Sequence, residues 1–219
     1  MKFILGKKIG MTQVFRPDGT VVPVTKIEAG PCVVTQVKTK EKDNQEAVQI
    51  GFGSVKKFRL NKAEAGHLKD VKAGNDETAT VRFLRDQKSE GNNLNRGDVF
   101  TVKIFNAGEK VSVVGTSKGR GFQGVVKRHG FHGQSQTHGI KDQVRMPGSL
   151  GAGGVQRVFK GMRMGGHMGD AQVTVHNLEV VEVHPEANEI LLKGAVPGAR
   201  NGLLVISTKE GKIEIENKQ

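Results

Sequence analysis

One string of the sequence matches the dinucleotide-binding fingerprint, in which spaced glycines let the backbone turn tightly beside a pyrophosphate. The string is Gly119-Arg120-Gly121-Phe122-Gln123-Gly124, and it follows a predicted strand. Its context does not favour a nucleotide cofactor, because no second parallel strand is predicted after it and Asp142 is the only acidic residue near the expected place of a ribose ligand. We therefore predict no cofactor, and an enzyme that binds NAD or FAD is kept as the alternative from another class.

The same glycines suit a loop that contacts phosphates. Gly119, Gly121 and Gly124 lack side chains and let a phosphate approach the backbone closely, while Lys118 and Arg120 can neutralise its charge. A turn that is only flexible is the plainer alternative.

Four histidines of the same region raise the question of a metal site. His129 and His132 have a short spacing, and His138 and His167 follow. Residues 116–170 contain no Cys and only two carboxylates, so the further ligands that zinc needs are missing. We predict no metal site and expect the imidazoles to contact phosphates or to stack on bases, with plain solvent exposure as the alternative.

Two further strings interleave cations, glycines and soft apolar side chains. They cover residues 145–151 and 157–169 and contain four of the six Met. Thioethers fill irregular gaps, and Phe159 or Phe131 can stack on an unpaired base; an apolar cluster that ties the stem of the loop together explains them equally well. No pattern combines a nucleophile, a base and an orienting group, so we predict that the protein is not an enzyme.

These strings all lie in one unusual segment, residues 116–170. It holds 14 of the 30 Gly and 9 Lys or Arg against 2 Asp or Glu, and its only regular signal is one or two helical turns over residues 122–128. Ordering such a segment costs about 1 to 2 kcal/mol of backbone entropy per residue, which its own apolar groups do not offset. We expect a long loop that is disordered when free and ordered by a polyanion such as RNA.

The expected contacts with RNA fall into two groups. The side chains expected to bind RNA are Lys118, Arg120, Lys127, Arg128, His129, His132, Arg145, Arg157, Lys160, Arg163 and His167. The glycines expected to let RNA approach the backbone closely are Gly119, Gly121, Gly124, Gly148, Gly151 and Gly161.

The segments that flank this loop read as short strands separated by turns. A helix is predicted over residues 62–71, with Asn61 as its N-cap and Gly74 beyond its end. Many short strands without βαβ spacing indicate a mainly β fold with a barrel or sandwich. The predicted strands are residues 3–5, 12–15, 21–27, 33–38, 47–52, 78–84, 99–105, 110–114, 172–183, 189–193 and 203–208, with turns at 16–19 and 185–188.

Charge and composition restrict the partners and the compartment. The chain has 219 residues and a net charge of +12, which indicates a polyanionic partner. No apolar run is long enough to span a membrane, and the apolar start is too short for a secretory signal, so we expect a cytoplasmic protein without a membrane partner. The single Cys32 rules out an internal disulfide, and we expect it to be a buried apolar residue.

Several strings, in order, resemble the family of bacterial large-subunit ribosomal protein three. The resemblance covers nearly the whole chain, in which no internal repeat stands out. The strings are Leu5-Gly6-Lys7-Lys8-Ile9-Gly10-Met11-Thr12, Gly115-Thr116-Ser117-Lys118-Gly119-Arg120-Gly121-Phe122-Gln123-Gly124, Lys127-Arg128-His129-Gly130, Pro147-Gly148-Ser149, Arg157-Val158-Phe159-Lys160-Gly161, Met168-Gly169 and Lys193-Gly194-Ala195-Val196-Pro197-Gly198.

The resemblance implies a fold and a function. The fold would be a translation-protein type β-barrel from residues 1–115 and 171–210, with an α+β insertion at about residues 56–91 and a tail at 211–219. The loop, residues 116–170, would enter large-subunit (23S) RNA toward the peptidyl transferase centre. The protein would bind near the 3′ domain of that RNA, support early subunit assembly and contact neighbouring ribosomal proteins, with no homo-oligomer expected. A free RNA chaperone or assembly factor is the alternative.

Two positions depart from what the resemblance implies. Relatives often carry His where this chain has Val144, so any contact of that His is lost or replaced. Some relatives carry a methylated Gln beyond the Pro-Gly-Ser turn, but Gly151-Ala152-Gly153-Gly154 stands there and Gln156 lies out of place. The resemblance also implies that changes near the loop tip, which by match is at about residues 145–157, alter the response to antibiotics that act at the peptidyl transferase centre.

Overall fold

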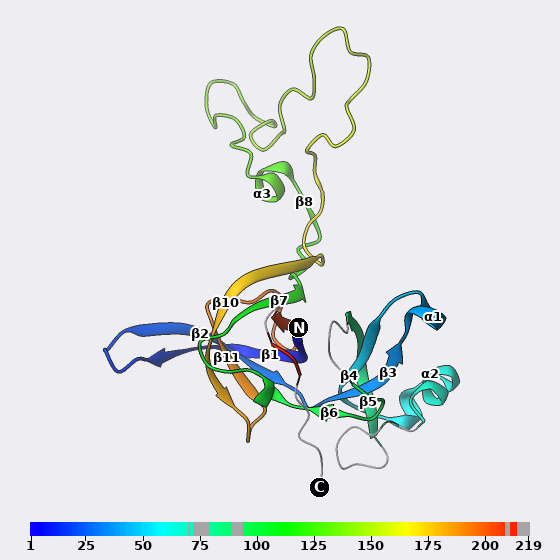
Figure 1. Cartoon of the computed structure of the whole chain (residues 1–219). Helices are drawn as coiled ribbons and strands as arrows, with labels where there is room; N and C mark the ends of the chain where they lie inside the picture. The colour runs from blue at the N-terminus through cyan, green and yellow to red at the C-terminus, as the bar shows by residue number, and fades with distance from the viewer. Residues whose placement is uncertain (70, 72–78, 89–93, 209–210, 214–219) are drawn as a thin grey trace. The chain divides into compact units, whose positions relative to one another are not determined.

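The computed structural model describes residues 1–69, 71, 79–88, 94–208 and 211–213 (Figure 1). It divides into two units, one formed by residues 1–116 with 172–219 and the other by residues 117–171. The first unit contains a β-barrel and a second sheet, and the second unit contains the glycine-rich segment.

A closed, antiparallel barrel of six strands forms the body of the first unit, which confirms the prediction of a mainly β fold with a barrel. The strand order around the barrel is β1-β12-β7-β10-β11-β2. Closure leaves no unpaired edge within these strands. The bounds are β1 (Lys2–Phe15), β2 (Val21–Ala29), β7 (Lys110–Thr116), β10 (Gln172–His184), β11 (Glu189–Lys193) and β12 (Leu203–Thr208).

The two longest strands bend because each contains irregular pairing. β1 pairs with β12 through residues 2–7 and with β2 through residues 6–15, and its register shifts between Lys8 and Gly10. β10 shifts register against β7 between Val175 and Leu178, where Asn177 has a φ of 59°. Bulges of this kind increase twist and let a sheet curve closed.

A second, four-stranded sheet has the order β5-β4-β3-β6. Its strands are β3 (Cys32–Lys38), β4 (Ala47–Lys56), β5 (Ala79–Lys88) and β6 (Val99–Phe100). Short helices connect them or follow them: α1 (Lys40–Asp43), η1 (Lys57–Arg59), α2 (Lys62–His67) and η2 (Val102–Ile104).

One apolar core joins the barrel to the second sheet. Phe3, Ile4 and Leu5 of β1 are consecutive and all fully buried, although successive strand residues point to opposite faces. Both faces of β1 are therefore covered, and the ring of Phe3 meets that of Phe100 in β6 edge to face at 6.1 Å. Val34 and residues of β4 belong to the same cluster.

Cys32 lies in this core, as predicted, and behaves as a small apolar residue. Its sulfur accepts a hydrogen bond from the Leu5 N–H at 3.4 Å and donates to the Leu5 carbonyl at 3.6 Å. Burial raises the pKa of the thiol to about 12, so the nucleophilic thiolate is scarce near neutral pH.

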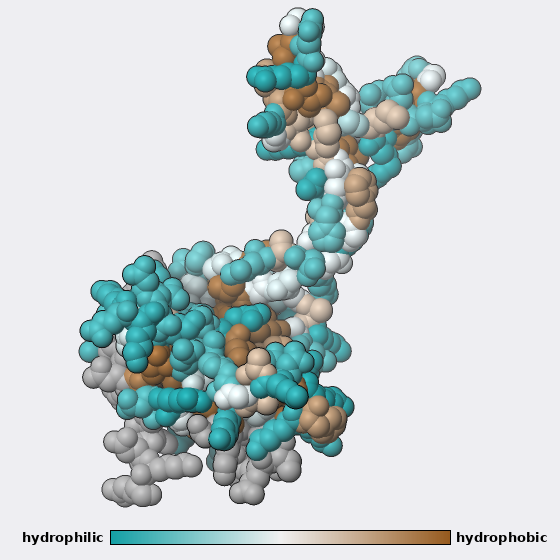
Figure 2. All heavy atoms as spheres, turned by 90° about the vertical axis from the view of Figure 1, so that its right-hand side faces the viewer, coloured by the Kyte–Doolittle hydropathy of each residue, from teal (hydrophilic) through white to brown (hydrophobic). Residues whose placement is uncertain are grey.

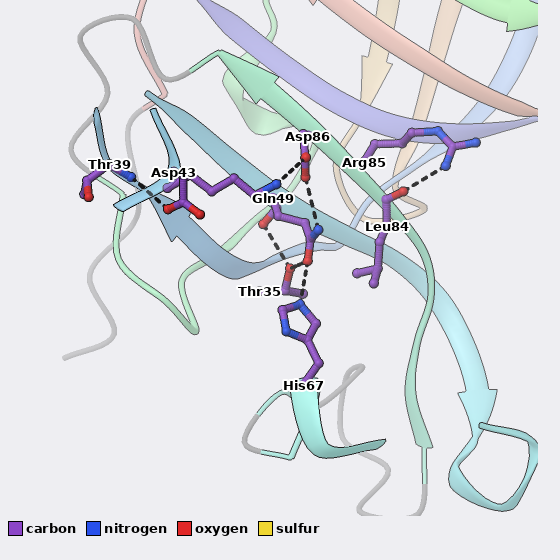
Figure 3. Close-up of polar contacts among 9 residues, drawn as sticks. Thr35, Thr39, Asp43, Gln49, His67, Leu84, Arg85 and Asp86 are labelled. Atoms are coloured by element: carbon purple, nitrogen blue, oxygen red, sulfur yellow. Dashed lines mark hydrogen bonds and ion pairs between the residues drawn. The ribbon is translucent and has the colours of Figure 1, made fainter. Parts of the chain in front are cut away.

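A polar network fastens α2 to the second sheet (Figure 3). The side chain of Gln49 donates from Nε2 to Asp86 Oδ1 at 3.1 Å, and its Oε1 accepts from Thr35 Oγ1 at 2.9 Å. His67 points from the end of α2 toward the same Oε1, at 2.7 Å. Because that oxygen can only accept, the Nε2 of His67 must carry the hydrogen. Lys38 completes the network with an ion pair to Asp86 at 2.6 Å, which raises the pKa of Lys38.

Most predicted strands and turns are present, with some differences in extent. The turn at residues 16–19 joins β1 to β2, but β1 is continuous where two strands were expected. The predicted strand 99–105 is wrong beyond Phe100, because the chain turns into η2, where the Phe105 N–H bonds the Val102 carbonyl at 3.0 Å and both side chains are buried.

The predicted helix is shorter than expected. Asn61 is its N-cap as predicted, but α2 ends at His67 instead of Val71. Leu68 and Val71 leave the helix and bury their side chains in a small cluster with Val33 and Val81. The expected Gly74 and the start of the strand at Thr78 lie outside the described residues.

The Cys32 thiol should react with a thiol reagent only when the chain unfolds. The folded pKa of about 12 lies above the ordinary 9.0. The stability contributed by the buried neutral thiol is thus fully present below pH 9 and is lost as pH rises toward 12. Ellman's reagent at pH 8, with and without urea, measures this, and equal reaction rates in both solutions would contradict it.

The barrel should fold without the segment 117–169. Thr116 and Gln172 are Cα partners in the β7–β10 ladder, so the deletion leaves Asp170-Ala171 as a two-residue hairpin connection. Cooperative thermal unfolding, followed by circular dichroism, should be retained. A second variant with Asn-Gly in place of Asp170-Ala171 controls for the turn type, and loss of the cooperative transition in both would show that the barrel needs the segment.

Candidate nucleic-acid interface

Residues 117–171, all of which the structure describes, are closed at their base by two hydrogen bonds between Ser117 and Ala171. The Ser117 N–H donates to the Ala171 carbonyl at 2.9 Å, and the Ala171 N–H donates to Ser117 Oγ at 3.2 Å. Further along, the Arg120 N–H donates to the Met168 carbonyl at 2.9 Å, and the Met168 N–H donates to the Gly121 carbonyl at 3.0 Å. These contacts form a narrow two-chain stem.

A short strand pair and one helix follow the stem. β8 (Phe122–Gln123) pairs with β9 (Gly166–His167), and α3 (Val125–His129) begins after Gly124. The helical turn expected within residues 122–128 is therefore present, shifted toward the C-terminus. Gly130 ends α3 in the left-handed conformation, with a φ of 72°, and its N–H bonds the Val126 carbonyl.

Two of the predicted RNA-binding side chains also connect α3 to the chain that returns toward β9. Nη1 of Arg128 donates to the Met164 carbonyl at 2.9 Å, and Nε2 of His129 lies 3.0 Å from the same oxygen. The carbonyl can only accept, so His129 carries its hydrogen on Nε2 here. Both side chains thus hold Met164 against α3 in the protein alone, without RNA.

Residues 117–171 contain closely packed glycines that the sequence pattern did not single out. A Cβ on Gly169 would collide with the Lys118 carbonyl, and the φ of Gly169 is +79°. Gly133 has a similar conflict with the Val144 carbonyl. A Cβ on Gly166 would lie 2.6 Å from Nη1 of Arg128, which is the movable end of a flexible side chain, so this position is less restricted. No local signal separates these glycines from their neighbours, because the need arises from chain segments that are distant in sequence.

The predicted glycines have the opposite surroundings. Around five of the six, nothing lies within 4 Å of the place that a Cβ would take; these are Gly121, Gly124, Gly148, Gly151 and Gly161. Gly119 has only an ordinary contact of 3.7 Å with Asp170. Three of the open glycines have positive φ values: Gly121 (+67°), Gly148 (+79°) and Gly161 (+81°). Their backbone is thus uncovered by the protein itself.

The segment has almost no core of its own. Val125, at 4% exposure, is the only buried side chain among residues 117–171. Phe122 is 79% exposed and Phe159 is 53% exposed. Figure 2 shows brown apolar side chains open to view on this unit, among teal polar ones. Such exposure is what a partner would have to cover.

The cations of the segment have few partners within the protein. Arg128 is the only one of the nine Lys and Arg with a side-chain hydrogen bond to the described part of the chain. The other eight are exposed and form no ion pair with any described residue: Lys118, Arg120, Lys127, Lys141, Arg145, Arg157, Lys160 and Arg163. Some barrel cations differ, since Lys2 pairs with Glu109 at 2.7 Å and Lys26 with Glu189 at 2.8 Å.

One recess gathers several of the predicted residues. It has a volume of about 400 Å³ and includes two imidazoles, His129 and His132, with Phe131, Met146 and Arg163. The rings of His129 and Phe131 lie 6.1 Å apart. Gly148 also lines it. The remaining predicted cations and His167 do not line it, so the predicted set is spread along the segment and does not converge on one site.

The fingerprint string does not form a nucleotide-binding turn. That turn runs from a strand directly into a helix, whereas β8 starts inside the string, at Phe122, and α3 has only five residues. Among the described residues, no three or more His, Cys, Asp or Glu are grouped so as to hold a metal ion. No helix in the described ranges is long and apolar enough to cross a membrane.

Comparison with known proteins shows the family. The model of the family "Ribosomal protein L3" matches residues 34–189. The chain is 57% identical over 206 residues to large ribosomal subunit protein uL3 of Herpetosiphon aurantiacus, covering 93% of this chain and 94% of the relative. It is 55% identical to uL3 of Roseiflexus sp. (93% and 95%) and 52% identical to uL3 of Heliobacterium modesticaldum (94% and 96%). The chain therefore belongs to the ribosomal protein L3 family, which consists of structural ribosomal proteins of the large subunit and not of enzymes.

Proposed function

We propose that the protein is built into the large ribosomal subunit and binds its 23S RNA mainly through residues 116–170. The observation that carries this proposal is the set of eight exposed cations without partners, in a unit with one buried side chain. Unpaired cations repel one another, and phosphates would remove that repulsion and release counterions. The uncovered glycines, among them Gly121, Gly148 and Gly161, would let the RNA backbone approach closely.

The finer features of the function follow from the family resemblance. We propose that the barrel, residues 1–115 and 171–210, anchors the protein near the 3′ domain of the RNA early in assembly in the cytoplasm. The loop would then extend toward the peptidyl transferase centre, with residues 145–157 nearest to it and Val144 in place of the His that relatives often carry. Other large-subunit proteins would be its neighbours.

RNA should protect the loop from proteolysis. A segment with so little buried surface is stabilised weakly in the free protein, so trypsin should cut after its exposed Lys and Arg first. Mass spectrometry of the fragments, with and without a 23S RNA transcript, measures the protection. Equal cleavage rates within residues 117–171 under both conditions would count against ordering by RNA.

Reversing loop charges should weaken RNA binding without destabilising the barrel. We expect Arg157→Glu with Lys160→Glu to lower the affinity for the 23S transcript and to flatten the salt dependence by roughly 0.7 to 0.9 per lost phosphate contact. Filter binding between low and moderate salt measures both quantities, and calorimetry checks the thermal unfolding.

The matched control reverses two exposed barrel cations, Lys110→Glu with Arg200→Glu. It changes the net charge by the same amount outside the loop. If both double variants weakened binding equally, general charge attraction would explain the result and the special role of the loop would be refuted.

A further inference from the structure

A short basic turn in the first unit presents an exposed aromatic ring. It consists of residues 56–62, Lys56-Lys57-Phe58-Arg59-Leu60-Asn61-Lys62, and contains four cations and no acidic residue. It runs from the last residue of β4 through η1 to the first residue of α2. We call it the 56–62 turn. It lies outside the glycine-rich loop.

The 56–62 turn is held in place on both sides. Lys56 is still paired with Ala79 of β5, and the Leu60 N–H closes η1 on the Lys57 carbonyl at 3.1 Å. The side chain of Leu60 packs against the small cluster that contains Val33 and Leu68. Because Leu60 is anchored inward and α2 starts immediately afterwards, the position of the turn is set by the fold.

Phe58 points away from this anchor. It is 77% exposed, and the guanidinium carbon of Arg59 lies 5.6 Å from the centre of its ring. An exposed cation–π contact contributes only about 0.5 to 1 kcal/mol, which does not account for leaving a phenyl ring in water. A rigid aromatic side chain flanked by cations loses little entropy on binding a partner.

The charge around Phe58 is positive, because residues 56–62 contain four cations and no acidic residue. The nearest carboxylate along the chain, Glu64, is engaged in the helix cap, where Oε2 accepts from the Asn61 N–H at 3.2 Å. Lys56, Arg59 and Lys62 form no ion pair with a described residue. Phosphates or carboxylates of a partner are therefore favoured beside the ring.

We propose that the 56–62 turn is a second RNA contact, in which Phe58 stacks on an unpaired base of the large-subunit RNA while Lys56 and Arg59 bind the flanking phosphates. The combination favours RNA over an acidic peptide, because a peptide carboxylate would use the cations and leave the ring without a matching flat surface. This inference rests on the proposed RNA-binding function but not on the loop as the means of binding.

The test compares Phe58→Leu with Phe58→Trp in the full-length protein. Leu keeps an apolar side chain but removes the flat ring, whereas Trp keeps a ring that can stack. We expect Phe58→Leu to weaken binding to the 23S transcript about tenfold with an unchanged salt dependence, and Phe58→Trp to retain affinity. Lys56→Ala with Arg59→Ala should instead flatten the salt dependence, by roughly 0.7 per cation on a single strand.

Phe15→Leu is the matched control. Phe15 is 65% exposed on β1, and its neighbour Arg16 is paired with Glu179 at 3.2 Å, so we expect this change to leave RNA affinity unaltered. Thermal unfolding of all variants should match the unchanged protein, because both rings are exposed.

Two results would overturn the proposal. Unchanged RNA affinity of Phe58→Leu excludes stacking. If the variant with unchanged RNA affinity were nevertheless absent from isolated large subunits, the ring would bind a protein of the subunit and not its RNA. Equal weakening by Leu and Trp also excludes stacking. The Arg157→Glu with Lys160→Glu variant tests RNA binding by the loop separately. If only the proposal for the 56–62 turn is wrong, Phe58→Leu keeps its RNA affinity while the loop variant loses affinity. If the proposed function is wrong, neither variant changes the RNA affinity.

Discussion

The structure depends on closure of the barrel between β7 and β10. This ladder pairs Thr116 with Gln172 and so holds the two ends of a 55-residue segment side by side. Bringing together the ends of a flexible segment of that length costs roughly 3.5 kcal/mol plus a constant. The barrel core meets this cost, because β7 and β10 also complete the closed sheet around Val111, Val113 and Val180. Val125 is the only buried apolar side chain that the segment itself contributes.

Several barrel cations and the loop cations differ in their partners. Barrel cations such as Lys2, Lys26 and Lys193 have carboxylate partners, which makes their positions part of the protein's own structure. The loop cations have none among the described residues, apart from the carbonyl that Arg128 contacts. Because the family consists of ribosomal proteins, we expect the loop cations to bind phosphates of RNA. The rings of Phe58 and Phe122 are likewise exposed in the protein alone, and we expect a partner to cover them.

Much of the fold could be predicted because strands carry local signals. The turn at residues 16–19 and the strands 189–193 and 203–208 were found from alternation and turn residues alone. The continuity of β1 was missed, because Gly6 and Gly10 resemble breaks, although pairing with β12 and β2 on either side keeps the strand extended. The local sequence pattern also did not predict which strands belong to the barrel and which to the second sheet. Alternation shows which face of a strand is buried, but it does not show which other strand covers that face.

The sequence alone determined the character of the loop, because glycine content and charge density are properties of composition that no distant contact can change. It also determined the family, through ordered strings that span the chain. Tertiary structure decided which of these residues make contacts within the protein. Gly169 allows Lys118 to approach in the stem, Arg128 and His129 bind the Met164 carbonyl, and Leu60 packs against the cluster around Val33. These roles come from contacts between segments far apart in sequence, and such contacts exist only after the strands have paired in register.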